Sequence, residues 1–311
     1  MESRTLISRK ITRMLFVFSV LALSLFISTA ALSASFDQHQ PALPRPDHII
    51  IVIEENQSYS KIIESPAAPY INSLAQNGAL FTQSYAITHP SQPNYLALFS
   101  GLTQNITDNS CPHTFSTTNL ASELIQAGRS FRGYSEDLPS IGSTICNTQG
   151  FAYVRKHNPW VNWQESSINR VPADHNLPFK EFPTDFSKLP TMSFVIPNQY
   201  HDMHDGRDPD RIQNADSWLK HHLDAYVQWA KTNNSLLILT WDEDDGTEAN
   251  RIPTIFVGPM VLTGRYDVKL THYNILRTIE EMYGLQHSGS SASAAPITNV
   301  WTSSKSFPRH N

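Results

Sequence analysis

Runs of consecutive apolar residues alternate along this chain with segments in which apolar residues recur every three or four positions. Uninterrupted apolar runs are typical of strands buried on both faces of a parallel sheet. Such runs occur at 48–54, 192–197, 235–241 and 254–257. The longer period, bounded by capping residues or proline and by glycine, predicts helices. These are expected at 68–77, 93–100, 119–127, from 214 or 215 to about 230, and from 272 to the residue before Gly284. Strands that alternate with helices predict a layered α/β fold with a mostly parallel sheet.

Residues 1–34 predict a secretory signal peptide. Four basic residues and one acidic residue precede an uncharged apolar run at 14–27, and small residues follow. These are the three parts of such a signal. The apolar run is short for a membrane span, and an uncleaved anchor is the alternative. We therefore expect an exported protein, periplasmic or secreted, with one mature domain at 35–311 and no stable membrane span after cleavage.

The charge and cysteines of the mature chain follow from this prediction. Loss of four bases and one acid with the signal would change the formal net charge from −5 to −8. An acidic chain has no general attraction for polyanions, which argues against a nucleic-acid partner. Cys111 and Cys146 are the only cysteines. In an oxidising compartment we expect them to form a disulfide.

Residues 139–190 show weak periodicity and are rich in turn-forming residues, which predicts a loop or cap insertion. Aromatic side chains in this segment would line a lipid-binding surface if the cap faced a membrane, and the alternative is that they belong to the core. The residues concerned are Phe151, Tyr153, Trp160 and Trp163.

Acidic residues follow two of the predicted strands. Glu54, Glu55 and Asn56 stand at the end of the first, and 242–246 (DEDDG) follows 235–241. The carboxyl ends of parallel strands meet at one edge of the sheet, where ligands bind. A divalent cation with oxygen ligands would remove the repulsion between such carboxylates. The alternative is a pair of solvated acidic turns. Glu54 and Glu55 should point to opposite faces, because a strand has a period of two.

Ser91 directly precedes the helix expected at 93–100. The free N–H groups at a helix N-terminus attract anions, so a phosphate could bind there with Ser91 as the nucleophile. The alternative is an ordinary N-cap serine. The chain has neither a G-x-S-x-G nor an H-E-x-x-H motif. Coordination of the hydroxyl by a metal is therefore the remaining way to activate this serine.

Four histidines lie near these features and could donate to phosphate, bind metal or protonate a leaving group. They are His89, His201, His204 and His272. We expect His221 and His222 to be structural. Ordinary polar positions on surface loops are expected for His39, His113, His157, His175, His287 and His310.

Five motifs, in order, carry a resemblance to a known family. They are HIIIVIEENQSY, THPSQPNYLALFSG, PNQYHDMHDG, ILTWDEDDG and HYNILRTIEEMYGL. Together they span about residues 46–300 and resemble bacterial acid phosphatases and phospholipase C-type phosphoesterases of the alkaline phosphatase superfamily. The resemblance implies an alkaline phosphatase-like three-layer αβα sandwich. The small secreted members of this family include phosphatases that act on phosphoinositides. Tyr95 stands where related sulfatases have arginine, which disfavours a sulfatase.

The resemblance also implies roles for particular residues. The metal ligands would be Glu55, Asn56, Ser91, Asp242 and Glu243. Asn94 would hold a phosphate oxygen, and His89 beside Ser91 is a further phosphate-binding candidate. The histidines of the family correspond to His201, His204 and His272, one of which would protonate the leaving group.

The function expected is therefore that of a metal-dependent acid phosphatase, which hydrolyses phosphomonoesters through a phosphoserine with at least one divalent metal ion. Its substrate would be a phosphorylated small molecule or lipid, and the family resemblance includes phosphoinositides among the candidates. The chain would be a monomer. The alternative within the same class is a phosphodiesterase or phospholipase C. The alternative from another class is a non-catalytic periplasmic binding module.

Overall fold

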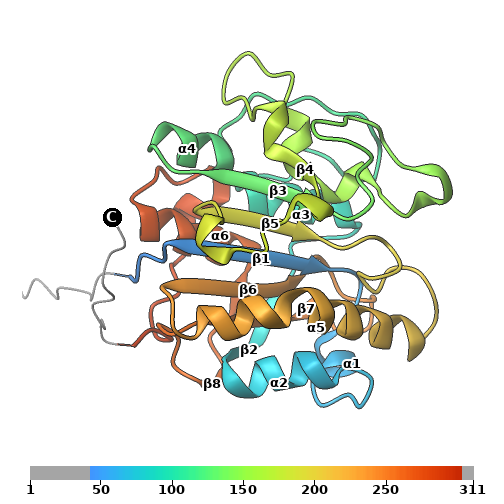
Figure 1. Cartoon of the computed structure of the whole chain (residues 1–311), viewed down its shortest axis with the longest axis vertical. Helices are drawn as coiled ribbons and strands as arrows, with labels where there is room; N and C mark the ends of the chain where they lie inside the picture. Colours follow the sequence, from blue (N-terminus) through green and yellow to red (C-terminus); the bar gives the residue numbers. More distant parts are fainter. Residues whose placement is uncertain (1–42, 303–311) are drawn as a thin grey trace, which may run out of the picture. The chain divides into compact units, whose positions relative to one another are not determined.

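A computed structural model describes residues 43–302, so the predicted signal peptide lies outside the described residues. Nine strands form one sheet in the order β4-β3-β5-β1-β6-β7-β2-β8, and β9 also pairs with β2. Strand β7 is antiparallel to β6 and β2, and the other strand pairs are parallel. Figure 1 shows β3, β5, β1 and β6 side by side. The predicted α/β fold with a mostly parallel sheet is confirmed.

The strands are β1 His48–Glu54, β2 Ala79–Tyr85, β3 Phe131–Ser135, β4 Asn176–Pro178, β5 Met192–Ile196, β6 Ser235–Trp241, β7 Arg251–Val257, β8 Gly264–Tyr266 and β9 Leu270–Thr271. The helices are α1 Tyr59–Ile62, α2 Pro69–Asn77, α3 Ser91–Ser100, α4 Leu120–Gln126, α5 Asp210–Ala230 and α6 His272–Tyr283. Helix α3 begins two residues earlier than predicted, and α5 about four residues earlier. The start of α3 matters for the site, because this helix begins at Ser91 itself.

Strand β1 divides the core into two layers. Ile49, Ile51 and Ile53 pack in one apolar cluster with helices α3, α4 and α6. Ile50 and Val52 pack in a second cluster with helices α1, α2 and α5. Alternate side chains of a strand point to opposite faces, so the continuous apolar run serves both helical layers. This arrangement is the three-layer αβα sandwich expected from the sequence.

The last helix shows how local signals set an element's limits. Thr271 and Asn274 form a reciprocal capping box at the start of α6, which satisfies backbone N–H groups that the helix leaves unpaired. Gly284 ends the helix in a left-handed conformation, with φ 65° and ψ 37°. His272 is therefore held at the first position of α6, at the carboxyl edge of the sheet.

Residues 139–190 form short 3₁₀ turns and β4, and part of this segment belongs to the core. Trp160 and Trp163 are fully buried beside α3, and Tyr153 is also buried. Phe151 is exposed. The idea that these four aromatics line a lipid-binding surface is therefore wrong for three of them. Within residues 43–302, no helix is long and apolar enough to span a membrane.

Candidate active site

Ser91 is the first residue of α3, a helix in which all ten residues are buried. Its hydroxyl donates to Glu55 Oε2 at 3.0 Å and lies 3.3 Å from Glu243 Oε1. The Lys156 ammonium donates to the same hydroxyl oxygen at 3.3 Å. The positive end of the helix dipole adds to the attraction for an anion at this position. The sequence prediction that Ser91 and the two strand-end acids meet at one edge of the sheet agrees with this geometry.

The carboxylates come from the ends of two neighbouring strands, β1 and β6. The backbone N–H of Asn56 donates to Asp242 Oδ1 at 3.1 Å, which ties the two strand ends together. Glu55 lies on the same side of the sheet as Ser91. Glu54 is completely buried, and it lies outside hydrogen-bonding contact with Ser91. The period of two thus selects Glu55, rather than Glu54, as the acid that faces the serine.

Burial and mutual repulsion perturb these carboxylates. The pKa of Asp242 is raised well above its usual range by burial and by the charges of Glu55 and Glu243. Burial and the charge of Glu55 likewise raise the pKa of Glu243 to about 7, with His89 opposing the shift. Burial and mutual repulsion therefore disfavour the charged form of both acids, and a cation at the site would stabilise their carboxylates.

The donor atoms at the site determine whether it suits a divalent cation. Within residues 43–302, no three His, Cys, Asp or Glu side chains are grouped so as to hold a metal ion. The acidic and amide side chains at the two strand ends and the Ser91 hydroxyl offer a mixed set of oxygens instead. Asn56 Oδ1 and Asp242 Oδ2 are buried without a hydrogen-bond partner among these residues. Buried oxygens of this kind are costly unless they are satisfied, and they suit a hard cation. The donor chemistry therefore fits a divalent metal.

Lys156 and His157 enter the site from the 3₁₀ turn Arg155–His157. His157 is buried, and its Nε2 lies 2.9 Å from Glu55 Oε1. The Tyr95 hydroxyl donates to the same oxygen at 2.7 Å, and the Tyr95 and His157 rings stack 4.9 Å apart. Burial would raise the pKa of Glu55, but His157 and then Lys156 lower it well below its usual range. Glu55 is therefore held as a carboxylate.

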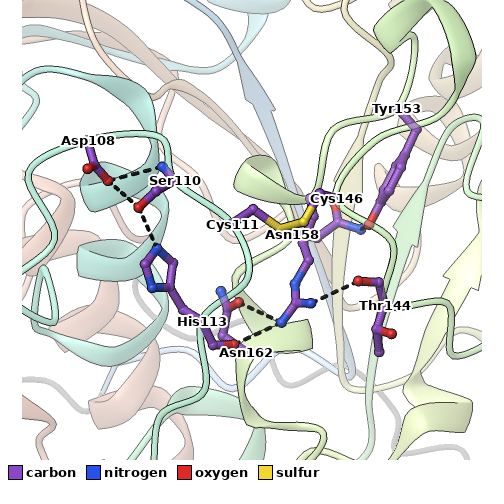
Figure 2. The surroundings of a disulfide bond; sticks show 10 residues. Asp108, Ser110, Cys111, His113, Thr144, Cys146, Tyr153, Asn158 and Asn162 are labelled. Carbon is purple, nitrogen blue, oxygen red and sulfur yellow. Dashed lines mark hydrogen bonds between the residues drawn. A yellow bond between two sulfur atoms is a disulfide. The ribbon is translucent and has the colours of Figure 1, made fainter.

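The turn itself is anchored by a disulfide and by Arg155. Cys111 and Cys146 form the expected disulfide, and the Arg155 backbone N–H donates to Cys146 O at 2.8 Å. The Arg155 guanidinium donates to Thr144 O, to His113 O and to Asn162 Oδ1. Figure 2 shows these acceptors around the disulfide. Two loops distant in sequence are thus joined beside the residues that approach Ser91.

A cavity of about 520 Å³ opens beside the carboxylates. Its lining is almost wholly polar or charged. The residues are Asn56, His89, Arg211, Glu243, Asp244, Asp245 and Gly246. A polar cavity of this kind suits a hydrophilic ligand group.

Comparison with known proteins places this site in a family. The model of the phosphoesterase family matches residues 63–286, which run from the residue after helix α1 to just beyond helix α6. The chain belongs to the phosphoesterase family. A phosphatidylinositol-3-phosphatase of Mycobacterium tuberculosis is 48% identical over 301 residues, which cover 95% of this chain and 97% of that protein. An acid phosphatase of Aspergillus fumigatus is 32% identical over 73% of this chain.

This phosphoesterase spans 53% of the length of the Aspergillus fumigatus protein. The solved structure of a Vibrio parahaemolyticus protein in the alkaline phosphatase superfamily superposes on this chain with a TM-score of 0.57 and 12% identity. The match covers 81% of this chain and 72% of that protein's chain. That likeness shows a shared fold. Family membership and the named relatives together show that the phosphoesterase is a hydrolase of phosphoric ester bonds.

The structure brings only some of the predicted histidines to the serine. His89 lies beside it, with Nδ1 2.7 Å from Glu243 Oε2 and Nε2 3.2 Å from Asp244 Oδ1. His272 is buried behind the site, where its Nε2 donates to the Asp242 carbonyl at 2.8 Å. Burial lowers the pKa of His272 to about 4, so the ring is neutral near pH 7.

His201 and His204 make their contacts with residues other than Ser91. His201 Nδ1 contacts Glu136 at 2.9 Å, and its ring stacks on Trp218 of helix α5. His204 Nδ1 contacts Asp205 at 2.8 Å, and its ring lies 6.4 Å from that of His157. These partners suit a supporting role for both histidines in the phosphoesterase.

The Asn94 side chain is fully engaged with the backbone. Its Oδ1 accepts from the N–H groups of Ile87 and Thr88, and its Nδ2 donates to the carbonyls of Thr88 and Pro90. An amide with both groups used in this way holds the loop before α3 in shape. The geometry differs here from the expected phosphate-binding role, because no donor of Asn94 is left for a ligand.

Sequence reasoning missed Lys156 and His157 and assigned His157 to a surface loop. That assignment is wrong, because the segment folds inward around Trp160 and Trp163. The weak periodicity of residues 139–190 concealed this packing. No local pattern in the sequence distinguishes Lys156 and His157 from surface residues.

Proposed function

We propose that this phosphoesterase is an exported, metal-dependent phosphomonoesterase that works through a phosphoserine on Ser91. The observation that carries the proposal is the Ser91 hydroxyl, which lies at the N-terminus of a buried helix with two carboxylates and one ammonium in contact with it. The names of the relatives, a phosphatidylinositol-3-phosphatase and acid phosphatases, support a phosphomonoester substrate and include a phosphoinositide.

The metal site proposed here uses the oxygen donors around Ser91. The residues that would hold the ion are Glu55, Asn56, Ser91, Asp242 and Glu243. A divalent cation supplies positive charge to the serine oxygen and to the oxygens of the phosphoryl group. The unpartnered oxygens of Asn56 and Asp242 and the raised pKa of Asp242 support this assignment.

In the first chemical step, Ser91 Oγ attacks phosphorus, so that the serine–phosphorus bond forms while the bond to the leaving oxygen breaks. The hydroxyl proton passes to Glu243, which already lies 3.3 Å from Oγ. His89, beside Glu243 and on the wall of the cavity, gives a proton to the leaving oxygen. This geometry favours His89 over His201, His204 and His272 as the acid.

In the second step, water attacks the phosphoserine and its proton passes to His89. The serine–phosphorus bond breaks, inorganic phosphate leaves, and Ser91 recovers its proton from Glu243. The charges of Glu243 and His89 are thereby restored. The amide groups at the start of α3 offset the negative charge on the non-bridging oxygens in both steps.

Export is supported by the N-terminal sequence pattern and by the disulfide, since disulfides form and persist in oxidising compartments. The substrate we propose is a soluble phosphomonoester or the headgroup of a phosphorylated lipid. We further propose that the protein acts as a monomer.

The replacement of Ser91 with alanine tests the proposed nucleophile. We expect Ser91→Ala to lower kcat on p-nitrophenyl phosphate by more than about a hundredfold. Brief incubation of the wild type with substrate, followed by acid quenching and mass spectrometry, should detect one phosphoryl group on the peptide that contains Ser91. Dialysis against EDTA should abolish turnover, and a divalent cation should restore it.

Ser100→Ala is a matched control, because Ser100 is a second buried serine on the same helix. It should retain nearly full activity. Retention of more than about one tenth of the activity by Ser91→Ala would refute the nucleophile assignment. Faster hydrolysis of bis(p-nitrophenyl) phosphate or phosphatidylcholine than of monoesters would instead favour a phosphodiesterase or phospholipase C. No turnover and no effect of EDTA would favour a binding module.

A further inference from the structure

Lys156 directs a largely buried ammonium at the proposed nucleophile. Its side chain is 12% exposed, and Nζ donates to Ser91 Oγ at 3.3 Å. Glu55 Oε2 lies 3.8 Å from Nζ, which is an ion-pair distance but is beyond a hydrogen bond. Of these two partners, the Ser91 hydroxyl is therefore closer to Lys156 Nζ than the Glu55 carboxylate is.

The surroundings of this ammonium leave room for a ligand. An ammonium carries three N–H donors, and the described residues give Nζ one hydrogen-bond acceptor, the Ser91 oxygen. Burial of an ammonium is costly unless its charge and its donors are satisfied. Glu55 offsets part of the charge. The same ammonium, already in contact with Ser91, therefore has donors left for an anionic ligand that binds at this serine.

Lys156 is also held in position from both sides along the chain. Arg155 is fixed by its backbone bond to Cys146 and by three side-chain hydrogen bonds. His157 is buried against Tyr95 and contacts Glu55. A long, flexible side chain between two fixed residues loses less freedom on binding a ligand than one on a free loop. The lysine is thus preorganised toward Ser91.

We propose that Lys156 is a catalytic residue whose ammonium binds a non-bridging phosphoryl oxygen and stabilises the Ser91 oxygen during attack. The role rests on the phosphomonoesterase function proposed above. Lys156 remains protonated throughout and neither gives nor receives a proton, so its contribution is electrostatic. Charge develops on the phosphoryl group and the serine oxygen in the transition state, where a fixed cation in a buried site has its largest effect.

Lys156→Met tests this role, because methionine keeps much of the side-chain volume without the charge. In the metal-loaded enzyme we expect kcat/KM for p-nitrophenyl phosphate to fall by about a hundredfold. Calorimetric binding of orthovanadate, which mimics the five-coordinate phosphoryl group, should weaken by a similar factor. Lys188→Met is the matched control, since Lys188 lies on the same segment with its side chain 76% exposed. It should leave both values unchanged.

A second variant separates the charge from the fold. Lys156→Cys should be as inactive as Lys156→Met, and alkylation of the new thiol with 2-bromoethylamine restores an ammonium at nearly the same position. The two native cysteines are paired in the disulfide and leave the new thiol as the site of reaction. Recovery of at least about one tenth of the wild-type activity is the expected result.

Three outcomes would overturn the role of Lys156. They are activity of Lys156→Met within about threefold of wild type, unchanged vanadate affinity in that variant, and failure of aminoethylation to restore activity. The proposed function fails in a different way, through Ser91→Ala. Retained turnover in Ser91→Ala would refute the nucleophile, while vanadate calorimetry, which needs no turnover, would still report on the contact with Lys156.

Discussion

Removal of the Cys111–Cys146 disulfide tests whether a covalent clamp outside the site holds Lys156 and His157 in place. The bond spans 35 residues of sequence. In the chain-entropy model, a loop of this size contributes about 4 kcal/mol at 25 °C, mainly by restricting the unfolded chain. For a domain of this size, we expect the double variant Cys111→Ser/Cys146→Ser to melt roughly 8 to 16 °C lower than wild type.

The same variant should lose activity for a second, local reason. Cys146 O accepts from the Arg155 backbone N–H, one residue before Lys156. Without the disulfide, the loop around Cys146 is less well fixed. A displacement of about 1 Å in a group that contacts the substrate can lower the rate substantially. We therefore expect kcat/KM to fall by at least about tenfold, even at temperatures where the variant is fully folded.

Urea denaturation gives the free energy of unfolding, and initial rates with p-nitrophenyl phosphate at low temperature give kcat/KM. Reduction of the wild type should reproduce both losses, whereas the reductant should leave the double variant unchanged, because the sequence contains no third cysteine. A stability loss below about 1 kcal/mol would refute the entropic estimate. Wild-type kcat/KM in the folded double variant would show that the disulfide does not position Lys156.

Two further substitutions probe the packing and the buried charge. A Cβ on Gly133 would stand 2.2 Å from Trp160 Cε2, so Gly133→Ala should lower the free energy of unfolding by about 2 to 3 kcal/mol, measured in urea. Burial raises the pKa of Glu123 to about 7, so the folded state favours the protonated acid. The stabilisation from this protonation is complete below the unfolded pKa near 4.3 and is lost as the pH rises through 7. Glu123→Gln should therefore be about 1 to 2 kcal/mol more stable than wild type at pH 8. This figure is smaller than the full pKa shift implies, because solvent and Ser288 still stabilise the charged form of Glu123. At pH 4 the variant and the wild type should have nearly equal free energies of unfolding. Equal stability at pH 8 would count against a raised pKa.

Much of the central sheet could be predicted because its strands are uninterrupted apolar runs. Strands β1, β5 and β6 lie within one residue of the predicted limits, and α6 begins and ends at its cap and its glycine. Strand β2 was missed because its sequence, ALFTQSY, is not an uninterrupted apolar run. Polar residues follow its first three positions, and part of the strand is exposed or half-buried. An uninterrupted apolar run identifies only those strands whose side chains are apolar on both faces of the sheet.

The candidate site was partly predictable for a related reason. Ser91, Glu55 and Glu243 lie at ends of regular elements, so the topology of the sheet brings them together. Lys156 and His157 come from a segment without periodicity, and their placement depends on tertiary contacts of Arg155 and on the disulfide. Those contacts join residues distant in the sequence, and no local pattern encodes them.

The burial of all ten residues of α3 has a consequence for how substrate range can change. If Ser91 is the nucleophile, its enclosed helix cannot adjust to different substrates, so each phosphate must reach the same fixed point. Discrimination between the groups attached to that phosphate then falls to lining residues of the cavity outside the proposed chemistry, such as Arg211 and Gly246. Substitutions at these residues can alter which alcohol is accepted while the reaction centre stays constant. One interior can in this way serve relatives that act on different phosphate esters.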